Sequence, residues 1–455
     1  MTKSNNHWPD SSAGLSRRSF LKGAGAGALA LSLGPLAGPW VQAAETITIG
    51  MANPLETFFG QAAEKALLLG IKQINASGGL LGKNLDLITS DTAGRPDQAL
   101  LAVEDLANRG ADFLTGFFFS EALIGTIPAI PVVRKILLDT GASTPVLTIQ
   151  VSKDYNNFKF FFRLGPVNSF FLLQLSVGFV RDFLEGKLGW KKIVLLAEDS
   201  AWTKPITDSF QTLLGAFGSK VQVVDVIRYA ESTTDFTSLF SRAVKAGSDG
   251  LFTIMAHTGT RPTAQWAAQK VPLPLVGINV QAQQGNFDQL TNGAAESVVT
   301  LTSAARAPVT KKTIPFVDDF AAFSDVFPQV TIPSYNAFSS YDALFMLKEA
   351  VEKAGTLPDN EANTDKIIAE LEQFGALKDG KPTDLFVGTT GHLGFYQRGE
   401  IGVTPLMPKQ AFPHDLRFGP GLAGGLWIQW QSGKQQVISP ANLKTAGFVL
   451  PPWMR

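Results

Sequence analysis

Histidine and cysteine, the side chains that most often hold metals or act as nucleophiles, are scarce in this sequence. There is no cysteine, which excludes disulfides, thiolate metal sites and a cysteine nucleophile. The four histidines, His7, His257, His392 and His414, are widely separated, so a zinc site built from histidine is not expected. His257 follows a predicted strand and precedes a turn. As a single residue it fits a hydrogen-bonding ligand contact or an ordinary loop residue better than a catalytic base.

Motifs of cofactor enzymes are also missing. Residues 419–424 (GPGLAG) have the glycine spacing of a dinucleotide-binding loop, but a strand rather than a helix is predicted after them. Neither a phosphate-binding loop ending in Gly-Lys-Ser/Thr nor a Gly-x-Ser-x-Gly nucleophile elbow occurs. The acidic pairs Asp318-Asp319 and Glu370/Glu372 fall on polar helix faces, where solvated carboxylates are common. The sequence therefore predicts a protein that is not an enzyme and has no cofactor and no metal site.

The elements that would position such residues alternate between strand and helix patterns. After a β-rich run at 46–50, apolar residues at three- and four-residue spacings predict a helix from Gly60 that ends at Ser77-Gly78-Gly79. The rhythm restarts after Phe162-Arg163 and continues to the strand at 275–277. Strands that alternate with helices in this way indicate βαβ units and parallel sheets. We therefore predict an α/β fold with two doubly wound parallel-sheet lobes.

Ligands of open α/β sheets bind at the carboxyl ends of the strands. The residues that follow the predicted strands carry hydroxyl, amide and aromatic groups, with Glu56 and Glu121 as their only acids and with no lysine or arginine. They are residues 53–59, 117–121, 140–144, 200–203, 256–260 and 279–284. A cleft of this composition suits a small neutral or weakly polar molecule. Within the Phe117-Phe118-Phe119 run, alternation along a strand allows only part to face the cleft.

Length and charge narrow the class of protein further. The 455 residues suggest two or three lobes of ordinary size. The 39 basic and 39 acidic side chains balance, which argues against a nucleic-acid binder. Charged residues make up 17%, below the roughly 25% usual in soluble domains.

The first 43 residues have the pattern of an export signal. Residues 16–22 (SRRSFLK) contain Arg17 and Arg18 in the twin-arginine pattern, a modestly apolar run follows, and residues 41–43 (VQA) fit a signal-peptidase site. A disordered basic tail is the weaker alternative. No cysteine stands at the cleavage site, so a lipoprotein anchor is excluded. We predict a soluble, slightly acidic periplasmic protein whose export partner is the twin-arginine translocase.

Several motifs together resemble the branched-chain amino acid (leucine/isoleucine/valine-binding) family of periplasmic solute-binding proteins of ABC transporters. The opening strand and its proline-containing loop lead into Phe59-Gly60, and residues 74–83 (INASGGLLGK) carry the most specific run. Phe162-Arg163 matches the first interlobe crossover, and residues 340–343 (SYDA) match a helix of the amino-terminal lobe. The resemblance spans roughly residues 46–440.

The resemblance implies a type I periplasmic binding fold, in which two lobes joined by a three-segment hinge close on a solute. The amino-terminal lobe would comprise residues 44–163 and 300–388, and the carboxy-terminal lobe residues 164–299 and 389–440. Residues 441–455 would form a tail.

The resemblance also implies ligand contacts at corresponding positions. Ser120 would offer a hydroxyl at a helix start, although a plain N-cap is an alternative for it. Trp202 would pack on the solute from the second lobe. The complete set is Phe59, Ser120, Ala142, Ser143, Thr144, Trp202, His257, Asn279 and Gln281.

One departure from the family bears on the solute. Asn279, with Gln281 nearby, stands where amino-acid binders place an acidic residue that meets the ligand ammonium. Burying an ammonium without a carboxylate is costly, although Glu56 could replace the missing acid. We therefore expect an amide, aromatic or carboxylate solute rather than a standard branched-chain amino acid.

These inferences lead to a functional prediction. The chain is expected to capture a small organic solute and deliver it to the membrane permease subunits of an ABC importer. One alternative is a periplasmic sensor that presents its ligand-bound state to a membrane kinase or receptor. The other is an exported enzyme, for which the sequence shows neither a cofactor loop nor a metal cluster.

Overall fold

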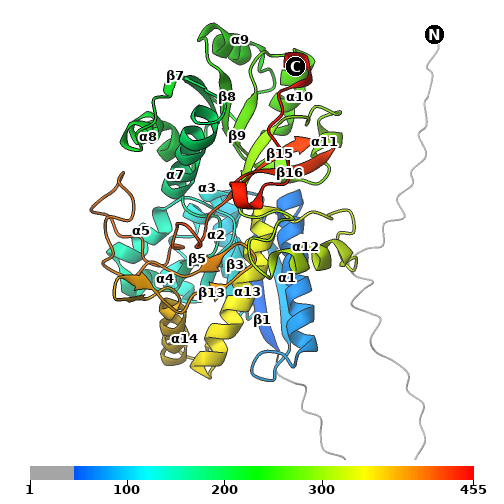
Figure 1. Ribbon diagram of the computed structural model, residues 1–455. Helices are drawn as coiled ribbons and strands as arrows, with labels where there is room; N and C mark the ends of the chain where they lie inside the picture. The colour runs from blue at the N-terminus through cyan, green and yellow to red at the C-terminus, as the bar shows by residue number, and fades with distance from the viewer. Residues whose placement is uncertain (1–45) are drawn as a thin grey trace, which may run out of the picture. The chain divides into compact units, whose positions relative to one another are not determined.

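The structure, a computed structural model, describes residues 46–455 (Figure 1). The predicted export signal, with Arg17 and Arg18, lies outside the described residues. Residues 46–455 fall within one compact unit. None of the helices in this part of the chain combines the length and the apolar character needed to cross a membrane.

Five parallel strands form the sheet of the first lobe, in the order β2-β1-β3-β4-β5. Strand β1 lies between β2 and β3, and its Gly50 pairs with Ile88 on one side and Leu114 on the other. Residues along β1 are almost all buried, as expected for a parallel strand covered on both faces. The strands are β1 (Ile47–Asn53), β2 (Leu85–Asp91), β3 (Phe113–Gly116), β4 (Leu137–Asp139) and β5 (Phe161–Arg163).

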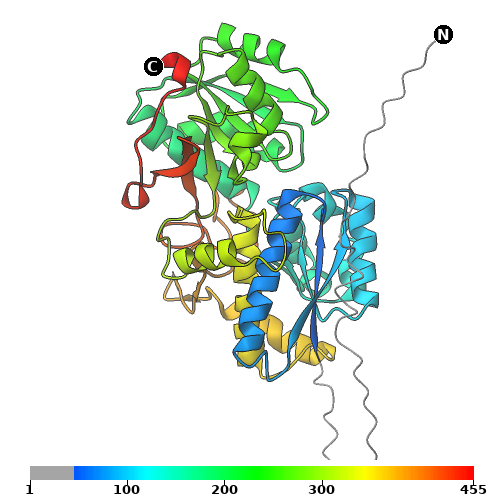
Figure 2. The same cartoon turned by 90° about the vertical axis from the view of Figure 1, so that its right-hand side faces the viewer.

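Helices cover both faces of this sheet. In Figure 2, α1 and α13 lie on one face and α2 on the other. The start of α1 is set by Thr57, whose side chain accepts a hydrogen bond from the amide of Gly60 at 3.1 Å. The helices of this lobe are α1 (Phe58–Ala76), α2 (Pro96–Asn108), α3 (Ser120–Gly125), α4 (Ile130–Val133), α5 (Val146–Lys153), α6 (Tyr155–Phe158), α12 (Thr313–Ala322), α13 (Tyr335–Ala354) and α14 (Glu361–Gln373).

Four further parallel strands form the main sheet of the second lobe, in the order β7-β6-β8-β9. They are β6 (Lys192–Glu198), β7 (Gln222–Tyr229), β8 (Gly250–Met255) and β9 (Leu275–Asn279). The accompanying helices are α7 (Ser169–Phe179), α8 (Thr203–Ala216), α9 (Thr237–Lys245), α10 (Thr260–Ala268) and α11 (Phe287–Leu290). Helix α7 begins after the N-cap Asn168, and a π-helix at Val180–Glu185 follows it directly.

An antiparallel sheet completes the second lobe. It contains β10 (Val299–Thr302), β15 (Leu426–Gln431) and β16 (Lys434–Ser439). Thr300 of β10 joins it to the main sheet, because its hydroxyl both donates to the carbonyl and accepts from the amide of Asn279. Between β10 and β15 the chain forms two short hairpins, β11–β12 (Leu377–Lys378, Lys381–Pro382) and β13–β14 (Phe386–Val387, His392–Leu393).

Residues 389–418 contact the first lobe, although the expected boundary assigned them to the second. His414 accepts a hydrogen bond at its carbonyl from the amide of Arg163, so this segment extends alongside β5. The ring of Phe395 packs on Phe162 at 5.0 Å. Buried Asp342 of α13 accepts hydrogen bonds from the amides of Thr389 and Thr390. The segment's many turn residues gave no pattern from which this pairing could be read.

The fold class predicted from the sequence is confirmed. Both main sheets are parallel, helices flank them, and the described chain passes between the lobes after β5, after β10 and before β15. The carboxyl ends of the two sheets therefore face a common space, where a ligand site is expected.

Candidate functional site

A cavity lies at the carboxyl ends of the strands, and its volume, including the part open to solvent, is about 570 Å³. Both lobes and the crossing segments contribute to its walls. The lining residues are Phe118, Ser120, Gly141, Ser143, Pro166, Val167, Leu172, Leu175, Trp202, Ala256, His257, Ile278, Val280, Gln283, Leu301, Thr302, Ser303, Tyr335 and Gly424. Most of these side chains are apolar, and none of them is a lysine, an arginine or a carboxylate.

Phe118 brings an aromatic face to the wall of the first lobe. The turn that presents it requires glycine at 116, because φ is +127° there and a Cβ would lie 2.2 Å from the carbonyl oxygen of Ala52. The Phe118 ring stacks on Phe59 at 4.3 Å and lies 6.1 Å from the ring of Tyr335. Phe117, by contrast, is fully buried in the core.

Two serine hydroxyls on this wall have no partner among the described residues. Ser120 begins α3 and Ser143 follows β4, and they are 3% and 6% exposed. Both line the cavity. Because these hydroxyls form no hydrogen bond to the described residues, they are suited to contacting a polar group of a bound molecule.

A buried ionic cluster holds the loop that carries Ser143. The Nη1 of Arg163 donates to Asp139 at 2.7 Å, and its two terminal nitrogens also donate to the carbonyls of Ala142 and Thr144. Asp139 in turn accepts from the amides of Gly141 and Ala142 at 3.2 and 3.0 Å. The 141–144 loop is therefore fixed at both its donors and its acceptors.

The same cluster reaches the second lobe. The Nε of Arg163 lies 3.1 Å from Asp415, whose other oxygen accepts from the side chain of Asn168 at 2.7 Å. Asn168 caps α7, and Ser169 donates from its amide to the carbonyl of Ser143 at 2.8 Å. Strand β5, the serine loop and the start of α7 thus form one hydrogen-bonded unit.

Tyr335 and Gln283 join the lobes at the other side of the cavity. The hydroxyl of Tyr335 donates to the carbonyl of Gly141 at 2.7 Å. Gln283 accepts from the amide of Tyr335 at 3.0 Å and donates to the carbonyl of Leu301 at 3.0 Å. Both side chains have their hydrogen bonds satisfied within the protein and shape the wall.

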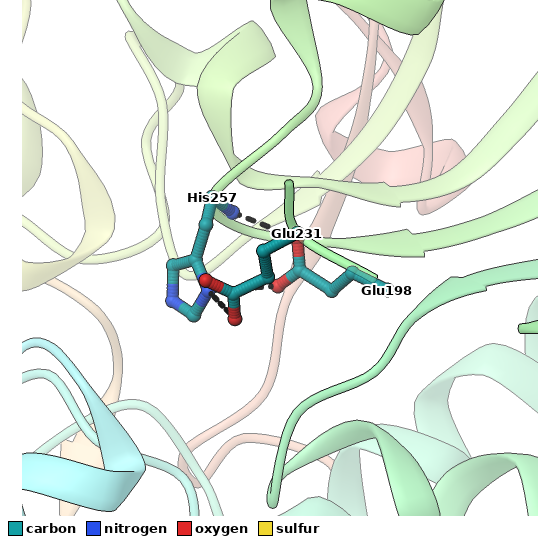
Figure 3. A group of neighbouring side chains, drawn as sticks. All are labelled: Glu198, Glu231 and His257. Carbon is teal, nitrogen blue, oxygen red and sulfur yellow. Dashed lines mark hydrogen bonds and ion pairs between the residues drawn. The ribbon is translucent and has the colours of Figure 1, made fainter. Parts of the chain in front are cut away.

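Behind the lining residues of the second lobe lies a buried carboxylate, Glu198, at the end of β6 (Figure 3). Its oxygens accept from the amides of Ala256 and His257 at 2.8 and 2.9 Å. They also accept from the hydroxyl of Thr258 at 3.1 Å and from the indole of Trp202 at 3.3 Å. Because all four groups donate, the geometry fits an ionised carboxylate.

His257 lies beside two carboxylates. Its Nδ1 is 2.7 Å from Glu231 and 3.2 Å from Glu198 (Figure 3). Burial acts to lower the pKa of His257, but attraction to Glu198 and Glu231, with a smaller contribution from Glu121, raises that pKa above its ordinary value. The ring also stacks on Phe119 of the first lobe at 4.2 Å.

Glu198, Glu231 and His257 are the group among the described residues whose ligand atoms lie close enough together, within 4.8 Å, to be considered for a metal ion. The fit is poor. Glu198 already accepts four hydrogen bonds. A metal would have to displace these donors, whereas a proton on His257 leaves them in place. We therefore interpret the group as an imidazolium held by two carboxylates.

A further interlobe contact lies near His257. Glu121 of α3 accepts from the hydroxyl of Ser200 at 3.0 Å and from the amide of Ala201 at 2.6 Å. Ser200 and Ala201 follow β6, so this contact joins the two lobes.

The structure brings four of the nine predicted contact residues to the cavity: Ser120, Ser143, Trp202 and His257. Phe59 lies behind Phe118, while Ala142 and Thr144 face Arg163 through their carbonyls. Whether these residues bind a solute stays a prediction.

Asn279 and Gln281 turn to partners in their own lobe. The Nδ2 of Asn279 lies 3.3 Å from the hydroxyl of Thr263 and 3.5 Å from the carbonyl of Gly259. Gln281 accepts from the amide of Thr260 at 2.7 Å and donates to the carbonyl of His257 at 2.7 Å. Neither side chain lines the cavity.

The sequence reasoning missed several residues of the wall. Tyr335 follows no clear strand signal and reaches the cavity only through the crossing geometry. Gln283 lies within the predicted strand-end segment 279–284 but was not singled out there. Glu198 ends β6, just before the strand-end segment 200–203 that was considered. Phe118 could have been singled out, since it is the middle residue of an aromatic run after Gly116.

Similarity to known proteins defines the class. Residues 46–395 match the periplasmic binding protein family model, so the chain belongs to this family. It is 24% identical over 375 residues to the leucine-, isoleucine-, valine-, threonine- and alanine-binding protein of Pseudomonas aeruginosa, which covers 79% of this chain and 88% of that protein. It is also 24% identical to Leu/Ile/Val-binding protein homolog 3 of Brucella melitensis, over 78% of this chain and 88% of the relative.

Solved structures share the fold. A putative branched-chain amino acid ABC transporter protein from Silicibacter pomeroyi superimposes with a TM-score of 0.70 at 17% identity, covering 90% of this chain and 100% of that one. A solute-binding protein from R. palustris in complex with benzoate gives 0.66 at 16% identity, over 87% and 96%. The resemblance to solute-binding proteins of branched-chain amino acid ABC transporters, predicted from the sequence, is confirmed.

Proposed function

We propose that this chain is an exported receptor that captures a small organic solute between its lobes and delivers it to an ABC importer. The family consists of solute-binding proteins rather than enzymes. The observation that carries the proposal is the cavity at the strand ends, with two serine hydroxyls on its wall that have no partner among the described residues.

The cavity favours a solute with an apolar body and one polar end. Phe118, Trp202 and Leu172 offer apolar surface, while Ser120 and Ser143 offer hydroxyls. An amide, aromatic or carboxylate compound fits this composition. A free ammonium does not, because no carboxylate lines the cavity and Asn279 points elsewhere.

A thermal-shift screen over small carboxylates, amides, amines and amino acids tests the receptor function. A bound solute stabilises the folded chain in proportion to the logarithm of its excess over the dissociation constant. We expect at least one compound with an apolar body to raise the midpoint temperature of thermal unfolding. Absence of a shift with every compound would contradict the proposal.

Calorimetric titration with leucine, isoleucine and valine tests the solute class. We expect no binding at micromolar concentrations of these amino acids. Micromolar or tighter affinity for any one of them would show that an ammonium is accommodated without a carboxylate in the cavity.

The export route is proposed from the sequence alone. Replacing Arg17 and Arg18 together by lysine should abolish transfer to the periplasm if the twin-arginine translocase reads this signal. Fractionation of cells that express the variant measures the outcome, with the unaltered chain as the control. Export of the double variant at the normal level would contradict this route.

A further inference from the structure

We propose that His257 is the residue that makes the cavity specific for anions: as an imidazolium fixed by Glu198 and Glu231, it binds the carboxylate of a solute that lacks an ammonium group. This inference rests on the proposed receptor function and narrows its solute class. It has four grounds in the structure.

The first is the inventory of charge around the cavity. No lysine, arginine or carboxylate side chain lines it, and His257 is the lining residue able to carry a positive charge near neutral pH. Tyr335 also lines it, but its hydroxyl already donates to the carbonyl of Gly141. A negative charge on the solute would therefore be met by His257.

The second ground is how the imidazole is held. Nδ1 faces Glu231 at 2.7 Å and Glu198 at 3.2 Å, whereas Nε2 has no hydrogen-bond partner among the described residues. Figure 3 shows the Nε2 edge of the ring pointing away from both carboxylates. The side chain is 8% exposed and lines the cavity, so the Nε2–H is available to an acceptor on a bound solute.

The third ground is the set of charged groups around the ring. Glu198 faces it from β6, Glu231 from the loop after β7, and Glu121 from α3. Arg261 of α10 lines a second groove, on the outer side of His257, but its guanidinium donates to the carbonyl of Thr233. The carboxylates therefore outnumber the cations near His257, and they favour its charged form.

The fourth ground is the position of the two free hydroxyls. His257 stacks on Phe119 at 4.2 Å and lies 6.0 Å from the ring of Phe118, so it contacts the segment that leads directly into Ser120. Ser120 and Ser143 line the same cavity. A carboxylate at this end of the cavity would meet donors from both lobes.

The affinity for a carboxylate solute should depend on pH. A carboxylic solute stays ionised above about pH 5. Because the pKa of His257 is raised, the anion-binding form is populated below that raised pKa. Affinity for the carboxylate should therefore be full at about pH 6 and should fall as pH rises through the pKa of His257.

The first experiment needs no solute. The ring signals of the four histidines in the full chain are followed by NMR during a pH titration, and His257→Gln assigns the signal. We expect His257 to titrate above the ordinary histidine value of about 6.5, and Glu231→Gln to lower its pKa. Titration of His257 at or below that ordinary value would overturn the proposal, whatever the protein binds.

The second experiment uses matched probes: benzoate with benzamide, and 4-methylpentanoate with its amide and with leucine. Calorimetry at about pH 6 should show carboxylate binding that weakens about tenfold or more in His257→Gln. The control His392→Gln, on exposed β14, should bind normally. If an amide or leucine binds better than its carboxylate, or if His257→Gln leaves the affinity unchanged, the assignment is wrong.

Glu231→Gln distinguishes a charge-holding role from a structural one. It should move the midpoint of the affinity–pH curve to lower pH and leave affinity unchanged at the acidic end. An equal loss at every pH would indicate structure alone and would contradict the proposal. Loss of binding on adding a chelator would identify a metal rather than a proton and would also contradict it. The receptor function itself fails only if no compound of any charge binds.

Discussion

Two ionic clusters lie beside the cavity, and they differ in which hydrogen-bonding groups they leave without a partner. In the first lobe, Arg163 is fully buried with Asp139 and Asp415, and its donors also meet two backbone carbonyls. In the second, His257 meets Glu198 and Glu231 on one ring edge and leaves the other at the cavity. The first cluster fixes backbone, whereas the second keeps a charged group available for binding.

The difference follows from the chemistry of the cations. A guanidinium has five donors in a planar arrangement, which suits the simultaneous binding of carboxylates and carbonyls. An imidazolium has two donors on opposite edges, so holding one edge leaves the other directed outward. The two clusters therefore respond differently when their cation is removed.

Removing the cation of the first cluster should have the largest effect. Arg163→Met leaves Asp139 and Asp415 buried without a countercharge, and we expect a loss of about 3–5 kcal/mol in the free energy of unfolding. Chemical denaturation measures it. The exposed pair Arg306–Asp318 provides the control, since Arg306→Met should cost about 1 kcal/mol or less. Equal losses in the two variants would remove the structural distinction drawn for this cluster.

Removing an aromatic face beside the second cluster should affect binding. Trp202 lines the cavity, and its indole donates to Glu198. Trp202→Ala should weaken binding of the best carboxylate by about 1.5–3 kcal/mol through lost apolar contact. Calorimetry on folded protein measures the change, and Trp453→Ala, whose ring packs on Trp266, serves as the control. An unchanged affinity would exclude Trp202 from the site.

An acidic residue at position 279, as the resemblance to amino-acid binders implies, tests whether this position can contact a solute. In Asn279→Asp, a buried carboxylate would face the carbonyl of Gly259, which now lies beside the amide nitrogen. We expect a loss of about 1–3 kcal/mol in stability and no gain in leucine binding. The exposed Asn292→Asp should be neutral. Recovery of leucine affinity would show that residue 279 can reach the cavity.

The repeated strand and helix patterns were sufficient to predict the two parallel-sheet lobes, because buried parallel strands and amphipathic helices leave strong local signals. The pairing of residues 389–418 with β5 left no such signal, since it depends on single contacts such as that between Arg163 and His414. Contacts between residues far apart in the sequence determine this pairing, and they leave no local pattern from which it could be predicted.

The site shows the same limit at the level of single residues. Ser120 and Ser143 lie at strand ends, and strand ends could be found from the sequence. Asn279 also lies at a strand end, but its side-chain amide donates a hydrogen bond to Thr263. No local sequence pattern distinguishes a side chain that faces the cavity from one that faces its own lobe. The significance of His257 depends on Glu231, which is 26 positions away and comes close only in the folded chain.

The contact at Glu121 has a consequence for timing. Its two hydrogen bonds to Ser200 and Ala201 exist only while the lobes are together, so parting of the lobes must break them. They should lengthen residence without accelerating capture, because differences among related complexes lie mostly in dissociation. This interlobe contact, made by the residue that follows Ser120, would then govern how promptly a bound solute is released when the lobes part.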